Sequence, residues 1–112
     1  MFVVAGAGSP SVMSNMVISI EQHVDWIVAC LQHLRSTGRT SIEACADAED
    51  AWVEHVNATA AKTLYPEANS WYLGANVPGK PRVFMPYVGG IVDYRRRCED
   101  VAARGYPGFR LT

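Results

Sequence analysis

The chain has 112 residues, which is room for one domain or for a piece of one. Ten Lys and Arg against eleven Asp and Glu give a formal net charge of −1, and this balance disfavours a strongly basic nucleic-acid-binding protein and an acidic tail. No apolar run approaches the roughly 18–20 residues that a membrane span needs. The three cysteines, Cys30, Cys45 and Cys98, have no close spacing, so we expect free thiols in a reducing, cytoplasmic setting.

The chain opens on a segment with the composition of a buried strand. Phe2-Val3-Val4-Ala5 is rich in β-branched and aromatic residues, and so short a strand needs neighbours in a sheet. The only other strand candidates are residues 82–85 and 109–112. We therefore expect either a small helical domain with a hairpin or a C-terminal segment whose partner strands lie upstream.

A glycine turn leads into the first predicted helix. Gly6 and Gly8 permit a tight turn and a close approach of the backbone, and Ser9 with Pro10 suits a helix start that continues to about Ser36. Apolar residues at helical steps predict one buried face, made of Met16, Ile20, Val24, Ile27, Leu31 and Leu34. The start of this helix offers unpaired amides to an electron-rich edge of a cofactor, although a plain strand-to-helix turn explains the same pattern.

Two further helices are predicted. The second begins near Thr40, which has capping-box spacing to Glu43, and it ends at Tyr65-Pro66. Its first half is crowded with acids that we expect to face solvent: Glu43, Asp47, Glu49, Asp50 and Glu54. The third helix covers about residues 93–103, with Val92, Cys98 and Val101-Ala102 facing inward and the run Arg95–Arg97 facing solvent.

The segment 66–90 differs in amino-acid composition from the rest of the chain. It holds four of the six prolines, four of the nine glycines and several aromatic residues, and no acid lies between Ala68 and Val92. A long, ordered, locally basic and aromatic loop suits a ligand that carries a phosphate and a ring. A loop packed on its own aromatic side chains explains the composition equally well.

No self-contained catalytic set or metal site is evident. His23, His33 and His55 lack metal-ligand spacing. Ser11 stands where the third glycine of a dinucleotide-binding fingerprint belongs, and it is not part of a nucleophile elbow. We therefore expect no catalytic residue and no metal ligand within this chain.

Several longer motifs carry a resemblance to a known family, in order along nearly the whole chain. They are residues 6–16, 19–27, 50–57, 68–82, 84–90 and 106–109. The chain resembles the C-terminal part of the Baeyer–Villiger monooxygenases of the cyclohexanone, cyclopentanone and phenylacetone type.

The resemblance implies a fold and an activity. The fold is an α/β, mostly helical segment of a flavoprotein with two Rossmann-like dinucleotide-binding domains, one for FAD and one for NADP(H). Residues 1–112 form one C-terminal segment of the FAD-binding domain, and 66–90 is a mobile loop on the NADP side. The activity inserts one oxygen atom from O₂ into a ketone, giving an ester or lactone. The partners are the ketone, O₂ and the remainder of the enzyme, with no nucleic acid or membrane.

The resemblance also implies individual roles. Met16 and Asn15 contact the flavin, and Trp71 and Lys80 contact NADP(H). The substrate pocket is lined by Ser11, Val12, Met13 and Pro86.

The two dinucleotide fingerprints and the family's catalytic arginine are absent. We therefore expect that the isolated chain neither binds FAD tightly nor oxidises NADPH, and that an apolar face of its first helix is exposed. The alternative is a non-catalytic helical interaction module derived from such an enzyme.

Overall fold

The computed structural model describes residues 1–68 and 70–112. Asn69, which belongs to the predicted NADP-side loop 66–90, lies outside the described residues. Within them the fold is mostly helical, with helices α1 (Met16–Ser36), α2 (Ala46–Ala60) and α3 (Ile91–Ala103). Two short strands, β1 (Ile42–Ala44) and β2 (Phe109–Leu111), and three single 3₁₀ turns, η1 (Ser11–Met13), η2 (Tyr65–Glu67) and η3 (Trp71–Leu73), complete it.

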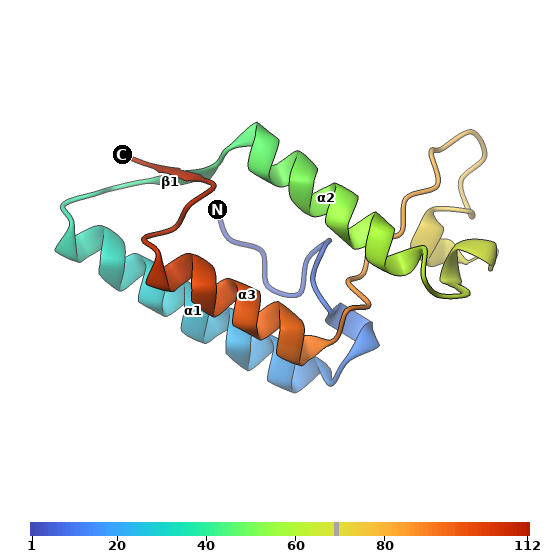
Figure 1. The fold of residues 1–112 in the computed structure, drawn as a ribbon, viewed down its shortest axis with the longest axis horizontal. Coiled ribbons are helices and arrows are strands. Elements are labelled where there is room, and N and C mark those ends of the chain that lie inside the picture. Colours follow the sequence, from blue (N-terminus) through green and yellow to red (C-terminus); the bar gives the residue numbers. More distant parts are fainter. Residues whose placement is uncertain (69) are drawn as a thin grey trace.

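The helices form an open, elongated arrangement (Figure 1). Helices α1 and α3 lie side by side, α2 lies on the other side of the N-terminal segment, and the loop 66–90 forms one end of the molecule. At the opposite end β1 and β2 pair antiparallel, with Ile42 opposite Leu111 and Ala44 opposite Phe109. The prediction of a strand near residues 109–112 is thus confirmed.

The predicted start of the second helix is wrong. Residues 42–44 form a strand instead of a capping box, and α2 begins at Ala46, after Cys45. The cause lies far away in the sequence, because the amides of Thr40 and Ser41 both donate to the Thr112 carbonyl and the Cys45 amide donates to the Gly108 carbonyl. Pairing with the C-terminal residues therefore overrides the local capping signal.

Helix α2 also ends earlier than predicted, at Ala60 and not at Pro66. The amide and the hydroxyl of Thr63 both donate to the Ala60 carbonyl, at 2.9 and 2.6 Å. These bonds span three residues instead of four, so they close the helix before the proline is reached.

Two predicted strands do not form. Residues 2–5 and 82–85 carry no strand in the described chain, and residues 4 and 5 form a turn. A lone extended segment has no ladder to satisfy its backbone, and neither of these segments finds a partner strand within the described residues.

The first helix buries a different side from the one predicted. It also begins later than predicted, at Met16 and not at Ser9-Pro10, because residues 11–13 form the separate turn η1 and Asn15 caps the helix. Its buried residues are Ser19, Gln22, His23, Cys30 and Leu34. Most of the predicted face is exposed, including Met16, Ile20, Val24 and Leu31. Helix α3 packs along the side with smaller and polar residues, which leaves the apolar face uncovered, as expected for the isolated chain. Val92 of α3 is exposed as well, against the prediction.

Buried side chains gather in two clusters. The sheet-end cluster is Cys30, Leu34 and Tyr106, against which Trp26, Ile42, Val101, Ala102, Phe109 and Leu111 pack. The loop-end cluster is Ala60, Leu73 and Phe84, with Met13, Tyr72 and Val88 packed against it.

The molecule is larger than a self-contained domain of its length. Its radius of gyration is 15.3 Å, against about 13 Å for a compact domain of this size. Its exposed area is 7441 Å², against about 6,100 Å² for a monomeric protein of this mass. No helix among the described residues is long and apolar enough to cross a membrane.

Candidate functional site

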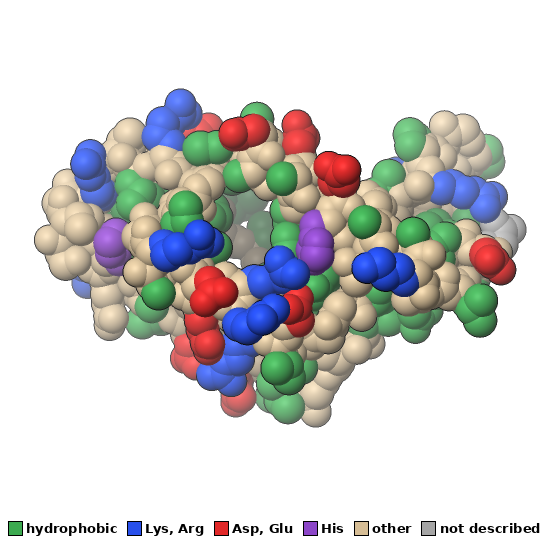
Figure 2. All heavy atoms as spheres, viewed as in Figure 1, with side chains coloured by type: hydrophobic (Ala, Val, Ile, Leu, Met, Phe, Trp, Pro, Cys, Tyr) green, Lys and Arg blue, Asp and Glu red, His purple; other side chains and the backbone are tan. Residues whose placement is uncertain are grey.

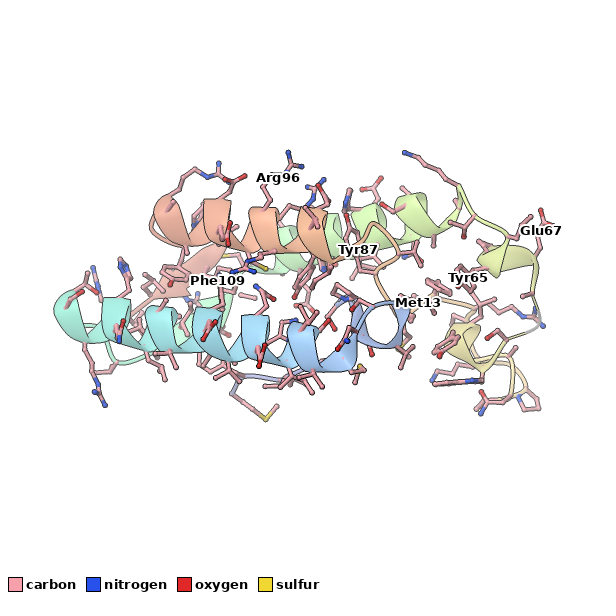
Figure 3. The ribbon with its side chains drawn as sticks, turned by 90° about the horizontal axis from the view of Figure 1, so that it is seen from below. Met13, Tyr65, Glu67, Tyr87, Arg96 and Phe109 are labelled. Atoms are coloured by element: carbon pink, nitrogen blue, oxygen red, sulfur yellow. The ribbon has the colours of Figure 1, made fainter. Side chains whose placement is uncertain are left out.

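Backbone hydrogen bonds join the turn before α1 to the end of the loop 66–90. The Gly8 amide donates to the Met85 carbonyl at 2.8 Å, and the Tyr87 amide donates to the Ser9 carbonyl at 2.8 Å. Pro86, which lies between them, is buried. We call these residues, 8–9 and 85–87, the junction. It brings Pro86, a predicted pocket residue, next to the segment that leads into Ser11. The neighbouring Tyr87 lies beside the start of α3 (Figure 3).

The Tyr87 side chain fixes the junction to two helices. Its hydroxyl donates to the Asp93 carboxylate on α3 at 2.6 Å, and Nε2 of His55 on α2 lies 3.3 Å from the same hydroxyl. The Trp52 ring centroid is 5.2 Å away. Tyr87 is 2% exposed, and a Cβ built at Gly89 would lie 2.2 Å from its phenolic oxygen. Gly89 therefore admits the ring at this position.

The charges around Tyr87 favour one protonation state. The Arg97 and Tyr87 hydrogen bonds, with a further bond from Arg96, hold the pKa of Asp93 well below its usual range. Burial, followed by the hydrogen bond to Asp93, raises the pKa of Tyr87. At neutral pH the phenol is therefore a donor to a charged carboxylate. This bond ties the end of the loop 66–90 to α3.

Gly8 confirms the prediction of a close backbone approach. Its φ is +76°, and a Cβ at this position would lie 2.8 Å from Nε1 of Trp52. That indole nitrogen donates to the Gly8 carbonyl at 3.1 Å. Trp52 on α2 therefore holds the turn from one side while Met85 holds it from the other.

The predicted flavin-side residues lie at the start of α1. Asn15 Oδ1 accepts from the amides of Val17 and Ile18, at 3.0 and 3.4 Å. The side chain of Met16, the first helical residue, is exposed. The stabilising contact of Asn15 is therefore a helix cap.

The four predicted pocket residues differ in how they are packed. Ser11 and Val12 belong to the turn η1, in which Ser11 has a φ of +46° and Val12 is exposed. Met13 packs into the loop-end cluster, and Pro86 lies in the junction. Met13 therefore packs against the loop 66–90, of which Pro86 is a part. The side chain of Val12 is exposed and lies away from the core.

The predicted NADP-side residues lie on the outer part of the loop. Trp71 is 66% exposed, and its ring lies against Tyr72 with centroids 4.0 Å apart. The Lys80 side chain runs over Gly74 and is exposed. Tyr65 and Tyr72 both pack on Phe84, at 5.2 and 6.3 Å. The loop is therefore held by its own aromatic side chains, and Trp71 stays accessible.

A cavity lies in the middle of the molecule, which the sequence did not indicate. Its volume is about 460 Å³, and its lining comes from the N-terminal segment, the three helices and β2. Figure 2 shows a hollow near the middle of the face in view. Two lining residues on α1, Gln22 and His23, are buried. Among the described residues no group of three or more His, Cys, Asp or Glu side chains is placed to hold a metal ion.

Comparison with known proteins finds homologues of the chain among monooxygenases. The chain is 46% identical over 100 residues to acetone monooxygenase (methyl acetate-forming) of Gordonia sp. (strain TY-5), covering 89% of this chain and 19% of that protein. It is 38% identical over 105 residues to a Baeyer–Villiger monooxygenase of Pseudooceanicola batsensis, covering 94% of this chain and 19% of that protein. The chain is a homologue of the Baeyer–Villiger monooxygenases. No family model matches it.

Solved monooxygenase structures share the fold. An oxidized steroid monooxygenase bound to NADP superposes with a TM-score of 0.89 at 43% identity, over 98% of this chain and 20% of that one. The OTEMO complex with FAD and NADP superposes with a TM-score of 0.85 at 32% identity, over 99% of this chain and 20% of that one. The chain thus spans about a fifth of the length of the Baeyer–Villiger monooxygenases that it matches.

Sequence reasoning missed the residues that hold the junction together. Trp52 and His55 are far from residues 85–87 in sequence, and Asp93 follows Tyr87 by six residues on a separate element. The one local signal was the sequence Pro86-Tyr87-Val88-Gly89-Gly90, in which an aromatic residue stands between a proline and two glycines.

Proposed function

We propose that the chain is the C-terminal segment of the FAD-binding domain of an NADPH- and FAD-dependent monooxygenase, located in the cytoplasm. The enzyme would insert one oxygen atom from O₂ into a ketone and release an ester or lactone. The observation that carries the proposal is the joint similarity in sequence and fold, over nearly the whole chain, to monooxygenases whose structures hold NADP, or FAD and NADP. The excess exposed area and the uncovered face of α1 support a surface that the remainder of the enzyme covers.

We assign the flavin contact to the start of α1. The Met16 side chain is exposed there, so it is available to pack on a flat ring. The oxygen of Asn15 is engaged in capping, and we therefore assign its amide nitrogen as the donor to the flavin. FAD supplies the redox chemistry; these residues orient it. Ser11, Val12, Met13 and Pro86 would form one wall of the ketone pocket.

We assign the NADP(H) contact to the outer part of the loop 66–90. Trp71 offers an exposed ring and one N–H donor, which suit a ribose and its neighbouring base. Lys80 offers a cation for a phosphate group. Gly74 and Gly79 have φ values of +71° and +78°, and flexible backbone at these points suits a loop that closes and excludes water.

The junction would link the two assigned contacts. Residues 85–87 are bonded to the turn 8–9, and they are also the end of the loop that carries Trp71 and Lys80. In this proposal a change in the loop is therefore transmitted to the pocket wall beside Pro86.

A chimera tests the proposed function. Residues 1–112 replace the aligned segment of the Gordonia acetone monooxygenase, and NADPH oxidation, bound flavin and ester product are measured with a panel of ketones. We expect ketone-dependent NADPH oxidation by the chimera and none by the isolated chain. A folded chimera that binds FAD but forms no ester or lactone would contradict the proposal. A chimera that loses FAD, together with an isolated chain that associates with other proteins, would favour the interaction module.

Trp71→Ala in the chimera tests the NADP(H) assignment. We expect the KM for NADPH to rise about tenfold and more NADPH to be oxidised without ester formation, because the nucleotide is held less well over the site. Trp71→Phe is the matched control, since it keeps a flat ring and removes the N–H donor. Unchanged affinity and coupling in Trp71→Ala would remove Trp71 from the mechanism.

A further inference from the structure

One buried tyrosine lies where the two parts of the assigned pocket wall meet. The Tyr87 amide donates to the Ser9 carbonyl at 2.8 Å. Pro86 directly precedes the donor, and the fully buried Pro10 directly follows the acceptor and leads into the turn η1 (Ser11–Met13). This single bond therefore joins both parts of the wall, Pro86 and residues 11–13. A shift of Tyr87 moves the two parts relative to each other.

The backbone around Tyr87 has no regular structure to fix it. Residues 82–90, which the structure describes throughout, form neither helix nor strand, so no ladder of backbone bonds sets their position. Met85 makes two bonds, because its amide donates to the Tyr72 carbonyl at 3.2 Å and its carbonyl accepts from the Gly8 amide at 2.8 Å. The next bonds along this segment are those of Tyr87, through its amide and its hydroxyl. The placement of Pro86, between these two residues, therefore depends on the Tyr87 side chain.

The hydrogen bonds at the Tyr87 hydroxyl run in one direction. The Asp93 carboxylate accepts from Arg96 and Arg97, at 2.5 and 2.7 Å, and between two guanidinium groups it stays charged and only accepts. The hydroxyl has one proton, which it donates to Asp93 at 2.6 Å. Nε2 of His55, 3.3 Å away, is therefore the donor to the Tyr87 oxygen. The hydroxyl is thus held from α2 and from α3 at once.

The ring and the hydroxyl of Tyr87 restrain it in different ways. The ring lies among the rings of Trp52 and Tyr94, with centroids 5.2 and 6.0 Å away, and this packing restrains the plane of the phenol. The hydroxyl bonds to His55 and Asp93 fix how far the side chain reaches between the two helices. A phenylalanine at this position keeps the first restraint and removes the second.

We propose that Tyr87 is a positioning residue for ketone recognition. Its hydroxyl, held by His55 and Asp93, sets the separation between Pro86 and the turn η1, and thereby the size of ketone that the pocket accepts. The inference rests on the proposed function, which assigns Pro86 and residues 11–13 to the pocket wall. Tyr87 is buried in the chain's own packing and acts through Pro86 and Ser9 without touching the ketone. Losing the hydroxyl loosens the wall, so a bulky ketone gains relative to a small one.

Tyr87→Phe in the chimera tests the effect on ketone choice, with acetone as the small ketone and cyclohexanone as the bulky one. We expect the ratio of kcat/KM for cyclohexanone to that for acetone to rise about tenfold, while the KM for NADPH and the bound FAD stay as in the parent chimera. A merely structural role would lower the folded fraction and reduce both activities equally, leaving the ratio unchanged. An unchanged ratio in an active chimera would overturn this inference alone. A parent chimera that forms no ester would overturn the proposed function, and this inference with it.

Variants of Asp93 in the chimera test the partner of the hydroxyl. Asp93→Leu removes the acceptor and should shift the ketone ratio as Tyr87→Phe does, and the double variant should shift it no further, because both changes remove the same bond. Asp93→Asn keeps an acceptor oxygen and should restore most of the parent ratio. Glu99→Leu is the matched control, since it breaks the exposed ion pair with Arg95 on the same helix and should keep the parent ratio. Additive shifts in the double variant would overturn the inference.

Crystal structures of the parent and Tyr87→Phe chimeras test the pocket wall independently of activity. We expect Pro86 and the turn η1 to lie farther apart in the variant, or to adopt two conformations, while the sheet-end cluster around Tyr106 is unchanged. The same positions of Pro86 and η1 in both structures would show that the hydroxyl does not place the wall, and would overturn the inference.

Discussion

The two ends of the molecule are held together by different means. At the sheet end, backbone pairing between residues 40–45 and 108–112 closes a cluster of helix side chains around Tyr106. At the loop end, aromatic rings and a few hydrogen bonds hold a segment with little regular structure around Phe84. The comparison indicates that the sheet end stabilises the chain, while the loop end carries side chains, such as Trp71, that remain available for contacts.

Tyr106→Ala tests the first half of this comparison and should have the largest effect. Tyr106 is 3% exposed, and its ring packs edge-on against Trp26 with centroids 5.3 Å apart. We expect the free energy of unfolding to fall by about 3–5 kcal/mol, as for other large buried aromatic residues, measured by urea denaturation followed by circular dichroism. Tyr65→Ala at the loop end is the control and should cost less than about 1 kcal/mol. Equal costs would contradict the comparison.

Gly89→Ala tests how tightly the junction is packed. The new methyl group would overlap the Tyr87 ring, so we expect the free energy of unfolding to fall by about 2–3 kcal/mol. We also expect the Tyr87 ring to be displaced, which a change in the near-ultraviolet circular dichroism would report. Gly90→Ala is the neighbouring control. A Cβ at Gly90 meets no atom within 4 Å, but its φ is +88°, so it should cost about 1 kcal/mol through backbone strain and leave the tyrosine signal unchanged.

Tyr87→Phe removes the hydroxyl bond to Asp93 and keeps the ring. We expect the free energy of unfolding to fall by about 1 kcal/mol at neutral pH. We also expect the pKa of Asp93 to rise towards its ordinary value, measured by NMR titration of the carboxyl group.

The acid dependence of this variant follows from the sign of the shift. The pKa of Asp93 is lower in the folded chain than in the unfolded chain, so its stabilisation is present above the ordinary carboxyl pKa and is lost as the pH falls through the folded value. The difference in stability between Tyr87→Phe and the parent chain should therefore shrink in acid. A difference that stays constant down to low pH would show that the hydroxyl stabilises by another contact.

Local patterns in the sequence predicted that three helices form, since helical periodicity is encoded within a few turns. They placed the start of the first helix at Ser9-Pro10, whereas the helix begins at Met16 behind the cap Asn15. The same patterns failed wherever a distant segment decides the outcome. Residues 42–44 carry a helix-start signal, yet they pair with residues 109–111. Residues 2–5 carry a strand signal, yet no strand lies beside them in the described chain. Strand pairing is a property of two segments, and a single segment does not reveal it.

In the candidate site, too, local features were predictable from the sequence and contacts between separate elements were not. The glycine at position 8 and the aromatic loop are visible as composition, and Gly8 indeed admits Trp52. The contacts of Tyr87 with His55 and Asp93 join three separate elements.

Trp71→Ala in the isolated chain should have the smallest effect of all. The ring is 66% exposed and lies against Tyr72 alone among the described aromatic side chains. We therefore expect the free energy of unfolding to change by less than about 0.5 kcal/mol, measured by urea denaturation. Trp52→Ala is the contrasting variant, because Trp52 is half-buried and its indole donates to Gly8, so a loss of about 3 kcal/mol is expected. A large loss of stability in Trp71→Ala would make this residue part of the packing at the loop end. A negligible loss in the isolated chain, together with the expected defect of the chimera towards NADPH, would mean that the exposed ring contributes to binding and not to folding.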